Sequence, residues 1–305
     1  MLFLMEVLVK KNSILSRSKI VKIFMMCIIL SGCGDWLIEK DYCSPTWKNT
    51  NTIYCIEREH KRRYFLGFFL HDDLYDFNLV SIDTEGAYYQ SLALLSERDA
   101  NDEPNADVAG DIYCSSSTLL YCDGTIKSIN EDGSIIDEIT VGMNPKISRD
   151  GQQIAYVYYN SGKNEVWTCN INGTNKKKIW DDTIWPYEVS WSSDSTKMAI
   201  LSADGPGTVS DGIYIVDINS LENTFIGLNG LTIDGIDWSP VDGKIAYCSG
   251  WLYTIDMDGS NNNKISSEYL GWPKWSSDGE KITGCSSGII VINKDGSGFR
   301  ILLSD

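Results

Sequence analysis

A short motif recurs along this sequence. Residues 238–245 read WSPVDGKI and residues 275–282 read WSSDGEKI, and each stretch is followed by an Asp-Gly-Ser turn signal. Each copy begins with an anchor residue, and an apolar residue that opens the next strand follows it. The apolar residue lies seven positions after the anchor in five copies and six positions after it in the first copy. This constant spacing indicates that the copies fold in the same register. The six anchors are Trp47, Ile112, Ile147, Trp191, Trp238 and Trp275.

Each copy reads as four short strands separated by turn signals. In the last copy, Asp-Gly turns at 278–279 and 295–296 lie between alternating apolar residues. Such a pattern favours hairpins, because Gly accepts a positive φ. One sheet of this kind cannot bury both of its faces, so the copies must pack face to face around an axis. The sequence therefore predicts an all-β fold, a six-bladed β-propeller of four-stranded antiparallel blades.

The copies account for residues 43–305 and leave no room for a second domain. Each terminal copy has four strands of its own, so we expect the ring to close by face-to-face packing of the first blade against the sixth. The first two anchors are 65 residues apart, which leaves room for insertions at 60–77 and 96–111. We expect both insertions to be loops on a face of the disc.

The start of the chain has the organisation of an export signal. Five basic residues lie within residues 1–22, and the uncharged run 23–30 follows them. A basic region, an apolar run and small residues, in this order, are typical of a signal peptide. The apolar run is too short to cross a bilayer as a permanent helix. We therefore expect a cleaved segment and not a membrane span.

The apolar run ends in Leu30-Ser31-Gly32-Cys33, which resembles the bacterial lipobox. The resemblance implies that residues 1–32 are a lipoprotein signal peptide and that Cys33 is acylated. Residues 33–42 would then be an acylated tether. Gly34 stands where retention in the inner membrane would require Asp, so in a bacterium with two membranes the resemblance implies the outer membrane, facing the periplasm.

The repeat itself resembles the WD40-like repeat of the TolB propeller family. That unit reads roughly as a Trp-Ser-Pro-Asp-Gly turn, an Ile-Ala-aromatic strand and an Asp-x-Asp-Gly-Ser turn. Residues 238–258 match it best, 191–219 and 275–297 match well, and the copies at Trp47 and Ile112 are degenerate. TolB has an α/β domain before its propeller, for which this chain leaves about ten residues. The resemblance therefore implies the TolB-like architecture and not the TolB partners.

Charge and motifs argue against several functions. Acidic residues outnumber basic ones by 42 to 26, and no Lys/Arg tract could cover a phosphate backbone, so nucleic-acid binding is disfavoured. The only histidines are His60 and His71, so residues 72–305 hold no imidazole for a catalytic triad or metal centre. No GxSxG, HExxH or phosphate-binding loop occurs. We expect no catalytic residues, no metal and no cofactor.

Asp-rich turns and cysteines have structural explanations. Asp256 and Asp258 resemble the start of a calcium loop, but Lys264 lies where a carboxylate would be needed, so turn formation is preferred. Seven cysteines follow Cys33 without a CxxC pair, mostly in apolar strands, which favours core positions. A single disulfide that uses Cys43 stays open.

The tryptophans divide into two groups. Four of them occupy the anchor position, which predicts packing between blades. Trp185 and Trp272 lie elsewhere, each before a Pro that precedes an innermost strand, and are candidates for the channel mouth. The acidic insertion at 96–111 adds Asp99, Asp102 and Glu103 as candidate partner contacts.

These observations favour a noncatalytic, lipid-anchored binding module of the bacterial cell envelope. As a monomer, it would present its loops and an axial funnel to a protein or peptide partner. The alternative is a glycan-binding or glycan-degrading propeller that uses acidic residues at one face. A scaffold without a defined ligand is the third interpretation.

Overall fold

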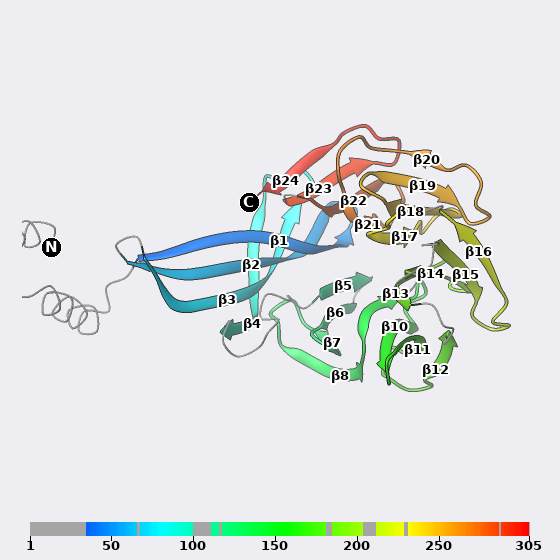
Figure 1. Cartoon of the computed structure of the whole chain (residues 1–305), viewed down its shortest axis with the longest axis horizontal. Coiled ribbons are helices and arrows are strands. Elements are labelled where there is room, and N and C mark those ends of the chain that lie inside the picture. The colour runs from blue at the N-terminus through cyan, green and yellow to red at the C-terminus, as the bar shows by residue number, and fades with distance from the viewer. Residues whose placement is uncertain are drawn as a thin grey trace, which may run out of the picture.

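The computed structural model describes residues 35–65, 68–99, 111–115, 118–180, 185–203, 212–228, 231–286 and 288–304. Within these ranges, 24 strands form six four-stranded antiparallel sheets around one axis (Figure 1). The same residues contain no helix, and so none that is long and apolar enough to span a membrane. The predicted six-bladed propeller is confirmed.

Every blade is a meander of consecutive strands. The first blade holds β1 (Asp35–Asn49), β2 (Thr52–Phe65), β3 (Phe68–Asp83) and β4 (Tyr89–Asp99), and the second β5 (Asp111–Ser115), β6 (Thr118–Cys122), β7 (Thr125–Ile129) and β8 (Ile135–Val141). The third holds β9 (Met143–Ile147), β10 (Gln153–Asn160), β11 (Lys163–Asn170) and β12 (Lys177–Trp180), and the fourth β13 (Trp185–Trp191), β14 (Lys197–Ala203), β15 (Gly212–Asp217) and β16 (Asn223–Gly227). The fifth holds β17 (Gly235–Trp238), β18 (Lys244–Cys248), β19 (Leu252–Asp256) and β20 (Asn263–Lys264), and the sixth β21 (Gly271–Trp275), β22 (Lys281–Cys285), β23 (Gly288–Asn293) and β24 (Arg300–Ser304).

The ring closes without exchange of strands between its ends. The first strand of each blade lies innermost, and each of these strands contacts the next one around the axis, including β21 against β1. Six apolar clusters fill the six interfaces between neighbouring blades. The cluster at the closure joins Trp47 and Ile53 of the first blade to Ile289 and Val291 of the sixth. Face-to-face closure, as predicted, is confirmed.

The anchor tryptophans lie in these interfaces. Trp47, Trp191, Trp238 and Trp275 are all buried, which confirms their expected core position. Three of their indole N–H groups also bridge blades. Trp191 donates to the carbonyl of Lys146 at 2.9 Å, Trp47 to that of Lys274 at 2.9 Å, and Trp275 to that of Asp237 at 3.2 Å. The anchor therefore joins each of these blades to the preceding one by packing and by a hydrogen bond.

The Ser-x-Asp and Asp-x-Ser sequences form the turns. The Ser192 hydroxyl donates to Asp194 at 2.7 Å and accepts from the Lys197 backbone at 2.9 Å, which closes the hairpin after the anchor. In the second turn type, Asp258 accepts from both the hydroxyl and the backbone N–H of Ser260, at 2.6 and 2.9 Å. These carboxylates stabilise turns, as the sequence interpretation favoured over calcium binding.

The register of the second blade differs from the expected one. Leu119 pairs with Cys114 and not with Ile112, which pairs with Tyr121. The Cys114 backbone N–H donates to the Thr46 hydroxyl at 3.1 Å, as the N–H of an anchor does elsewhere in the ring. Cys114 is therefore the anchor of this blade. The fixed offset of seven failed because the β5–β6 hairpin is shorter than its counterparts.

The first blade is longer than expected. Strand β1 begins at Asp35, and its residues 35–42 pair with β2, so the stretch expected as a tether is strand. The expected loop at 60–77 is likewise the β2–β3 hairpin, whose pairs continue to Phe65 opposite Phe68. Of the second insertion, residues 96–99 end strand β4, Asp111 begins β5, and 100–110 lie outside the described residues.

Six cysteines of the blades form no disulfide within the described part of the chain, and most of them lie in the core. Cys55, Cys122, Cys169, Cys248 and Cys285 are buried, and Cys114 is half-buried. These positions agree with the expected role of Cys as a small buried hydrophobic residue.

We predict that Trp191→Phe destabilises the protein by about 1–2 kcal/mol more than Trp238→Phe. Both side chains are fully buried, so the two substitutions leave similar cavities. However, Trp191→Phe removes a buried indole hydrogen bond, whereas the buried indole nitrogen of Trp238 has no hydrogen-bond partner among the described residues. Urea unfolding curves measure the difference, and equal losses would contradict the assigned role of the indole N–H.

Candidate functional site

A cavity of about 530 Å³ lies on the propeller axis, at the end where the innermost strands reach their anchors. All six blades line it. The lining includes the residue directly before each anchor, which projects toward the axis because side chains alternate along a strand. These six residues are Thr46, Tyr113, Lys146, Ser190, Asp237 and Lys274.

Basic side chains dominate the charged lining. Lys48, Lys146, Arg149 and Lys274 line the cavity, whereas Asp237 is the one acidic residue of the lining within the described part of the chain. This excess of positive charge contrasts with the net charge of −16 of the whole chain. Positive groups in a confined, partly desolvated cavity attract anions more strongly than the same groups on an open surface.

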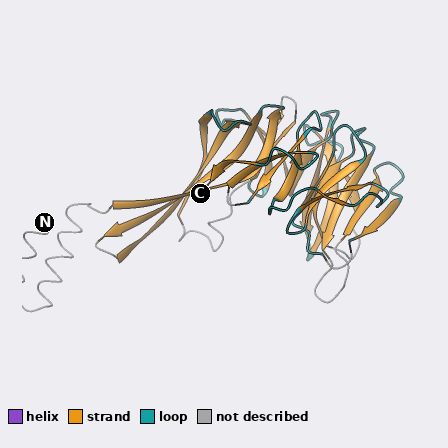
Figure 2. Ribbon diagram, turned by 90° about the horizontal axis from the view of Figure 1, so that it is seen from above, coloured by secondary structure: helices purple, strands orange, loops and turns teal. Residues whose placement is uncertain are grey.

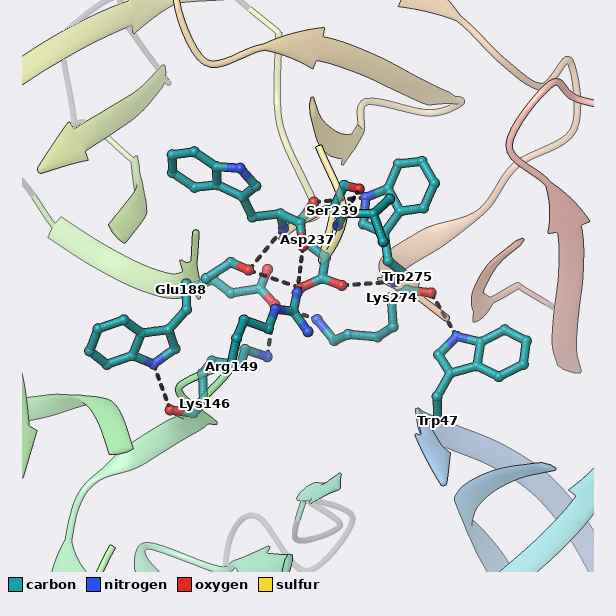
Figure 3. A network of polar contacts seen from close by, with 12 residues as sticks. Trp47, Lys146, Arg149, Glu188, Asp237, Ser239, Lys274 and Trp275 are labelled. Atoms are coloured by element: carbon teal, nitrogen blue, oxygen red, sulfur yellow. Dashed lines mark hydrogen bonds and ion pairs between the residues drawn. The ribbon is translucent and has the colours of Figure 1, made fainter. Parts of the chain in front are cut away.

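Glu188 holds two of these cations at the centre of the network in Figure 3. Its Oε1 lies 2.8 Å from the Nζ of Lys274 and 3.3 Å from that of Lys146. Its Oε2 accepts the Ile236 backbone N–H at 2.8 Å. The Lys146 ammonium also lies 4.3 Å from the centre of the Tyr113 ring, a cation–π distance. One carboxylate therefore faces two ammonium groups, and the trio keeps a net positive charge.

Asp237 and Ser190 connect the innermost strands of three blades. The Asp237 carboxylate accepts the Trp275 backbone N–H at 2.7 Å through one oxygen, and the Ser190 hydroxyl at 2.9 Å through the other. Ser190 in turn accepts the Trp238 backbone N–H at 2.9 Å. Because these acceptors are occupied by the protein itself, they position the site and are not free to bind a cation.

Arg149 and Lys48 are the more accessible cations. The Arg149 side chain retains 27% of its exposure, donates to the Trp238 carbonyl and lies 3.8 Å from Asp237. Its Nε is buried and has no hydrogen-bond partner among the described residues. Lys48 is 36% exposed and pairs with Glu131 at 2.6 Å. The arrangement leaves donors at the cavity for an incoming acceptor.

The buried charges perturb one another. Burial lowers the pKa of Lys146 to about 8, and the nearby charge of Lys274 adds to this effect. For Lys274, burial acts in the same direction, but Glu188 and Asp237 outweigh it and raise the pKa. Burial also opposes ionisation of Glu188, yet the two lysines hold its pKa below the usual value. Glu188 therefore remains a carboxylate near neutral pH.

The close packing of this network depends on one glycine. A Cβ on Gly235 would lie 2.8 Å from the Glu188 Oε2 and 3.0 Å from the Trp272 Cα. Any larger residue would displace the carboxylate that holds both lysines. Gly235 thus permits strands β13, β17 and β21 to approach each other beside the axis.

The residues singled out from the sequence lie apart from this cavity. Trp185 begins β13 and is 42% exposed, and Trp272 lies in β21 and is 51% exposed, but neither is part of the lining. Asp99 is the last residue of β4. Cys33, Asp102 and Glu103 lie outside the described residues. The roles of these six residues in lipidation or partner contact stay predictions.

Sequence reasoning missed the axial residues. Their signal was the position directly before each anchor, which the repeat alignment defined in every blade but the second, where it placed the anchor at Ile112 and not at Cys114. The residue types at that position are Thr, Tyr, Lys, Ser, Asp and Lys in the six blades, so no repeated chemistry marked them. Within the described ranges, no group of three or more His, Cys, Asp or Glu side chains is placed to hold a metal.

The sequence matches no family model and no curated protein. Its closed ring of meander sheets, with a polar cavity on the axis, defines it as a six-bladed β-propeller protein. More specifically, the propeller is TolB-like. A TolB-type structure from Agrobacterium tumefaciens matches with a TM-score of 0.61 and 18% identity, over 73% of this chain and 87% of that one. TolB from Acinetobacter baumannii matches with a TM-score of 0.54 and 12% identity, over 86% and 78%.

A structure from outside this group shows how widely the architecture occurs. A chain of the nidogen/laminin complex matches with a TM-score of 0.51 and 8% identity, over 74% of this chain and 80% of that one. At such identities the likeness establishes the fold alone.

We predict that the stability of the protein rises between about pH 7 and 9 because of Lys146. Its pKa is about 8 in the folded protein and 10.5 in a model peptide. In this window the unfolded chain binds more protons, so the free energy of unfolding increases with pH, by on the order of 1 kcal/mol. Lys146→Met should lack this increment, and Lys264→Met, at an exposed position, should keep it. An equal rise in all three proteins, measured by urea unfolding, would refute the assignment.

Proposed function

We propose that this protein is a noncatalytic binding module of the bacterial cell envelope, and that its axial cavity receives an acidic group of a protein or peptide partner. The observation that carries the proposal is the charge of the cavity. Among the described residues, four basic side chains line it against one acidic one, and the cations still exceed the acids by one when their partners Glu188 and Glu131 are counted, in a chain of net charge −16. A carboxylate of a partner would meet Lys48 and Arg149 first, with the Lys146–Lys274 pair behind them.

The distribution of charge also supports selectivity. The acidic surface of the protein repels an acidic partner, and only the cavity attracts the partner's acidic group. The position of that group on the partner therefore decides whether binding occurs. Guanidinium and ammonium groups form their strongest hydrogen bonds with ionised carboxylates. The exposed part of the Arg149 guanidinium and the Lys48 ammonium offer such bonds.

The glycan-degrading alternative receives less support from the same residues. A glycosidase needs one carboxylic acid with a raised pKa to protonate the leaving group. Glu188, the buried acid beside the axis, has a lowered pKa and accepts two ammonium groups and a backbone N–H. It therefore serves as a fixed counter-ion and not as a proton donor.

Peptide binding tests the proposed cavity. We expect a dye-labelled peptide with four Asp residues to bind the protein, and a matched peptide with four Lys residues not to bind. Lys48→Gln combined with Arg149→Gln should weaken binding of the acidic peptide by about tenfold, which is about 1.4 kcal/mol. Fluorescence anisotropy gives the dissociation constants.

The matched control is Lys163→Gln combined with Lys176→Gln, which removes two exposed charges outside the cavity lining. It should leave the affinity unchanged. Equal weakening by both pairs would mean that net charge and not the cavity decides binding. Capture from crosslinked envelopes then identifies the natural partner, and Asp102→Asn with Glu103→Gln tests whether the insertion at 96–111 contributes.

The proposal places the module on the membrane through acylated Cys33, on the outer membrane facing the periplasm in a bacterium with two membranes. The basic, apolar and lipobox-like segments of residues 1–33 support it. We expect mass spectrometry of the native protein to show the loss of residues 1–32 and an added acyl mass. An unmodified chain whose location does not change in Cys33→Ala would disprove the anchor.

A further inference from the structure

Three strands of the first blade continue beyond the propeller as a separate sheet. Strands β1, β2 and β3 contain 15, 14 and 16 residues. By comparison, the innermost strands of the other five blades contain at most 7 residues. Their outer parts, residues 35–42, 58–65 and 68–76, project from the ring, as both views show (Figures 1 and 2). We call this three-stranded sheet the arm.

The far end of the arm is aromatic. The last backbone pairs are Tyr64 with Phe69 and Phe65 with Phe68, so four aromatic residues occupy the final two rungs of the hairpin. In the sequence, no charged residue occurs between Arg63 and His71. An uncharged aromatic end on a projecting sheet contrasts with the acidic chain that carries it.

Charged residues begin directly behind this end, and they balance. Lys61, Arg62 and Arg63 follow one another on β2, and alternate residues of a strand belong to opposite faces, so both faces receive a basic residue. Three acids lie nearby: Asp35 pairs with Tyr64 at the aromatic end itself, Asp73 pairs with Arg62, and Asp72 adjoins Asp73. The tip of the arm therefore lacks the negative excess by which the rest of the chain repels anionic surfaces.

The N-terminal end of the described chain lies at the same tip. Asp35, the first described residue, pairs with Tyr64, and 34 residues precede it. A single residue, Gly34, lies between Cys33 and Asp35, so the two Cα atoms are at most roughly 7 Å apart. A lipid anchor on Cys33 would hold the aromatic end of the arm against the bilayer.

We infer that the tip of the arm, Tyr64, Phe65, Phe68 and Phe69, inserts into the lipid bilayer interface beside the anchor. The inference rests on the proposed acylation of Cys33. Aromatic side chains favour the interface between headgroups and acyl chains, and long basic side chains reach from there to the headgroups.

The paired strands of the arm would set the distance between the propeller and the membrane. Residues 35–42 are paired strand, so they act as a spacer of roughly 25 Å and not as a flexible tether. The arm would hold the propeller, with its axial cavity, at this distance from the membrane.

A fluorescent probe at the tip tests the inference. Residues 34–305 contain all six blades and their six core clusters, and a histidine tag before Gly34 can tether this chain to phosphatidylcholine vesicles that contain a nickel-chelating lipid. An environment-sensitive dye is attached at Phe65→Cys in a Cys43→Ser, Cys114→Ser background. We expect its emission to rise at least twofold on tethering.

The matched control carries the dye at Tyr88→Cys, in the turn at the opposite end of β3 from the arm, where the native side chain is 57% exposed. Its emission should not change. Phe68→Ser with Phe69→Ser should abolish the rise at position 65 while tethering and near-ultraviolet circular dichroism are retained. No rise at position 65 in tethered protein overturns the inference, and so does a concentration-dependent rise without vesicles, which would indicate pairing of two arms.

The histidine tag replaces the acyl group, so this result is independent of the lipid anchor. An unmodified Cys33 in the native protein would remove the proposed anchor and leave the dye response as measured. A modified Cys33 without a dye response would leave the anchor and overturn the membrane contact of the arm.

Discussion

The innermost strands of a propeller have one edge without a neighbour in their own sheet, and the N–H groups on that edge need acceptors. Here side chains of the preceding blade supply them. Thr46, Ser190 and Asp237, each directly before an anchor, accept the backbone N–H of the next anchor, and Glu188 does the same for Ile236. Because Trp47, Trp191 and Trp275 donate back to the preceding blade, hydrogen bonds reinforce the packing between blades.

This role of the axial positions also determines the chemistry of the cavity. The two carboxylates that accept these N–H groups, those of Glu188 and Asp237, are buried. Buried charges require partners. Lys146 and Lys274 supply them for Glu188, with Arg149 near Asp237. The cations exceed the acids, so the groups that stabilise the ring leave a positive cavity in an acidic protein. Structure and proposed binding therefore depend on the same residues.

The first blade combines two tasks. Its inner part closes the ring against the sixth blade through the Trp47 cluster, and its outer part forms the arm. The same three strands run from the arm into the blade, with an irregularity in the β1–β2 register between Cys43 and Thr46 at the junction. The membrane contact inferred for the tip would thereby orient the axial cavity, which lies beside Trp47 and Lys48 of the same blade.

The sequence by itself determined the number of blades, their four-strand order and the buried anchors, since the repeat spacing sets register and Trp at one position must pack between sheets. It did not reveal Cys114 as an anchor, because a shortened hairpin changed the offset. It also left the pairing of residues 35–42 with β2 undetected, since they carry no repeat signal and their partners lie about twenty residues further along. Only the tertiary structure decided that Lys146, Glu188, Asp237 and Lys274 meet, because four blades must close around one axis before their side chains come within hydrogen-bond distance.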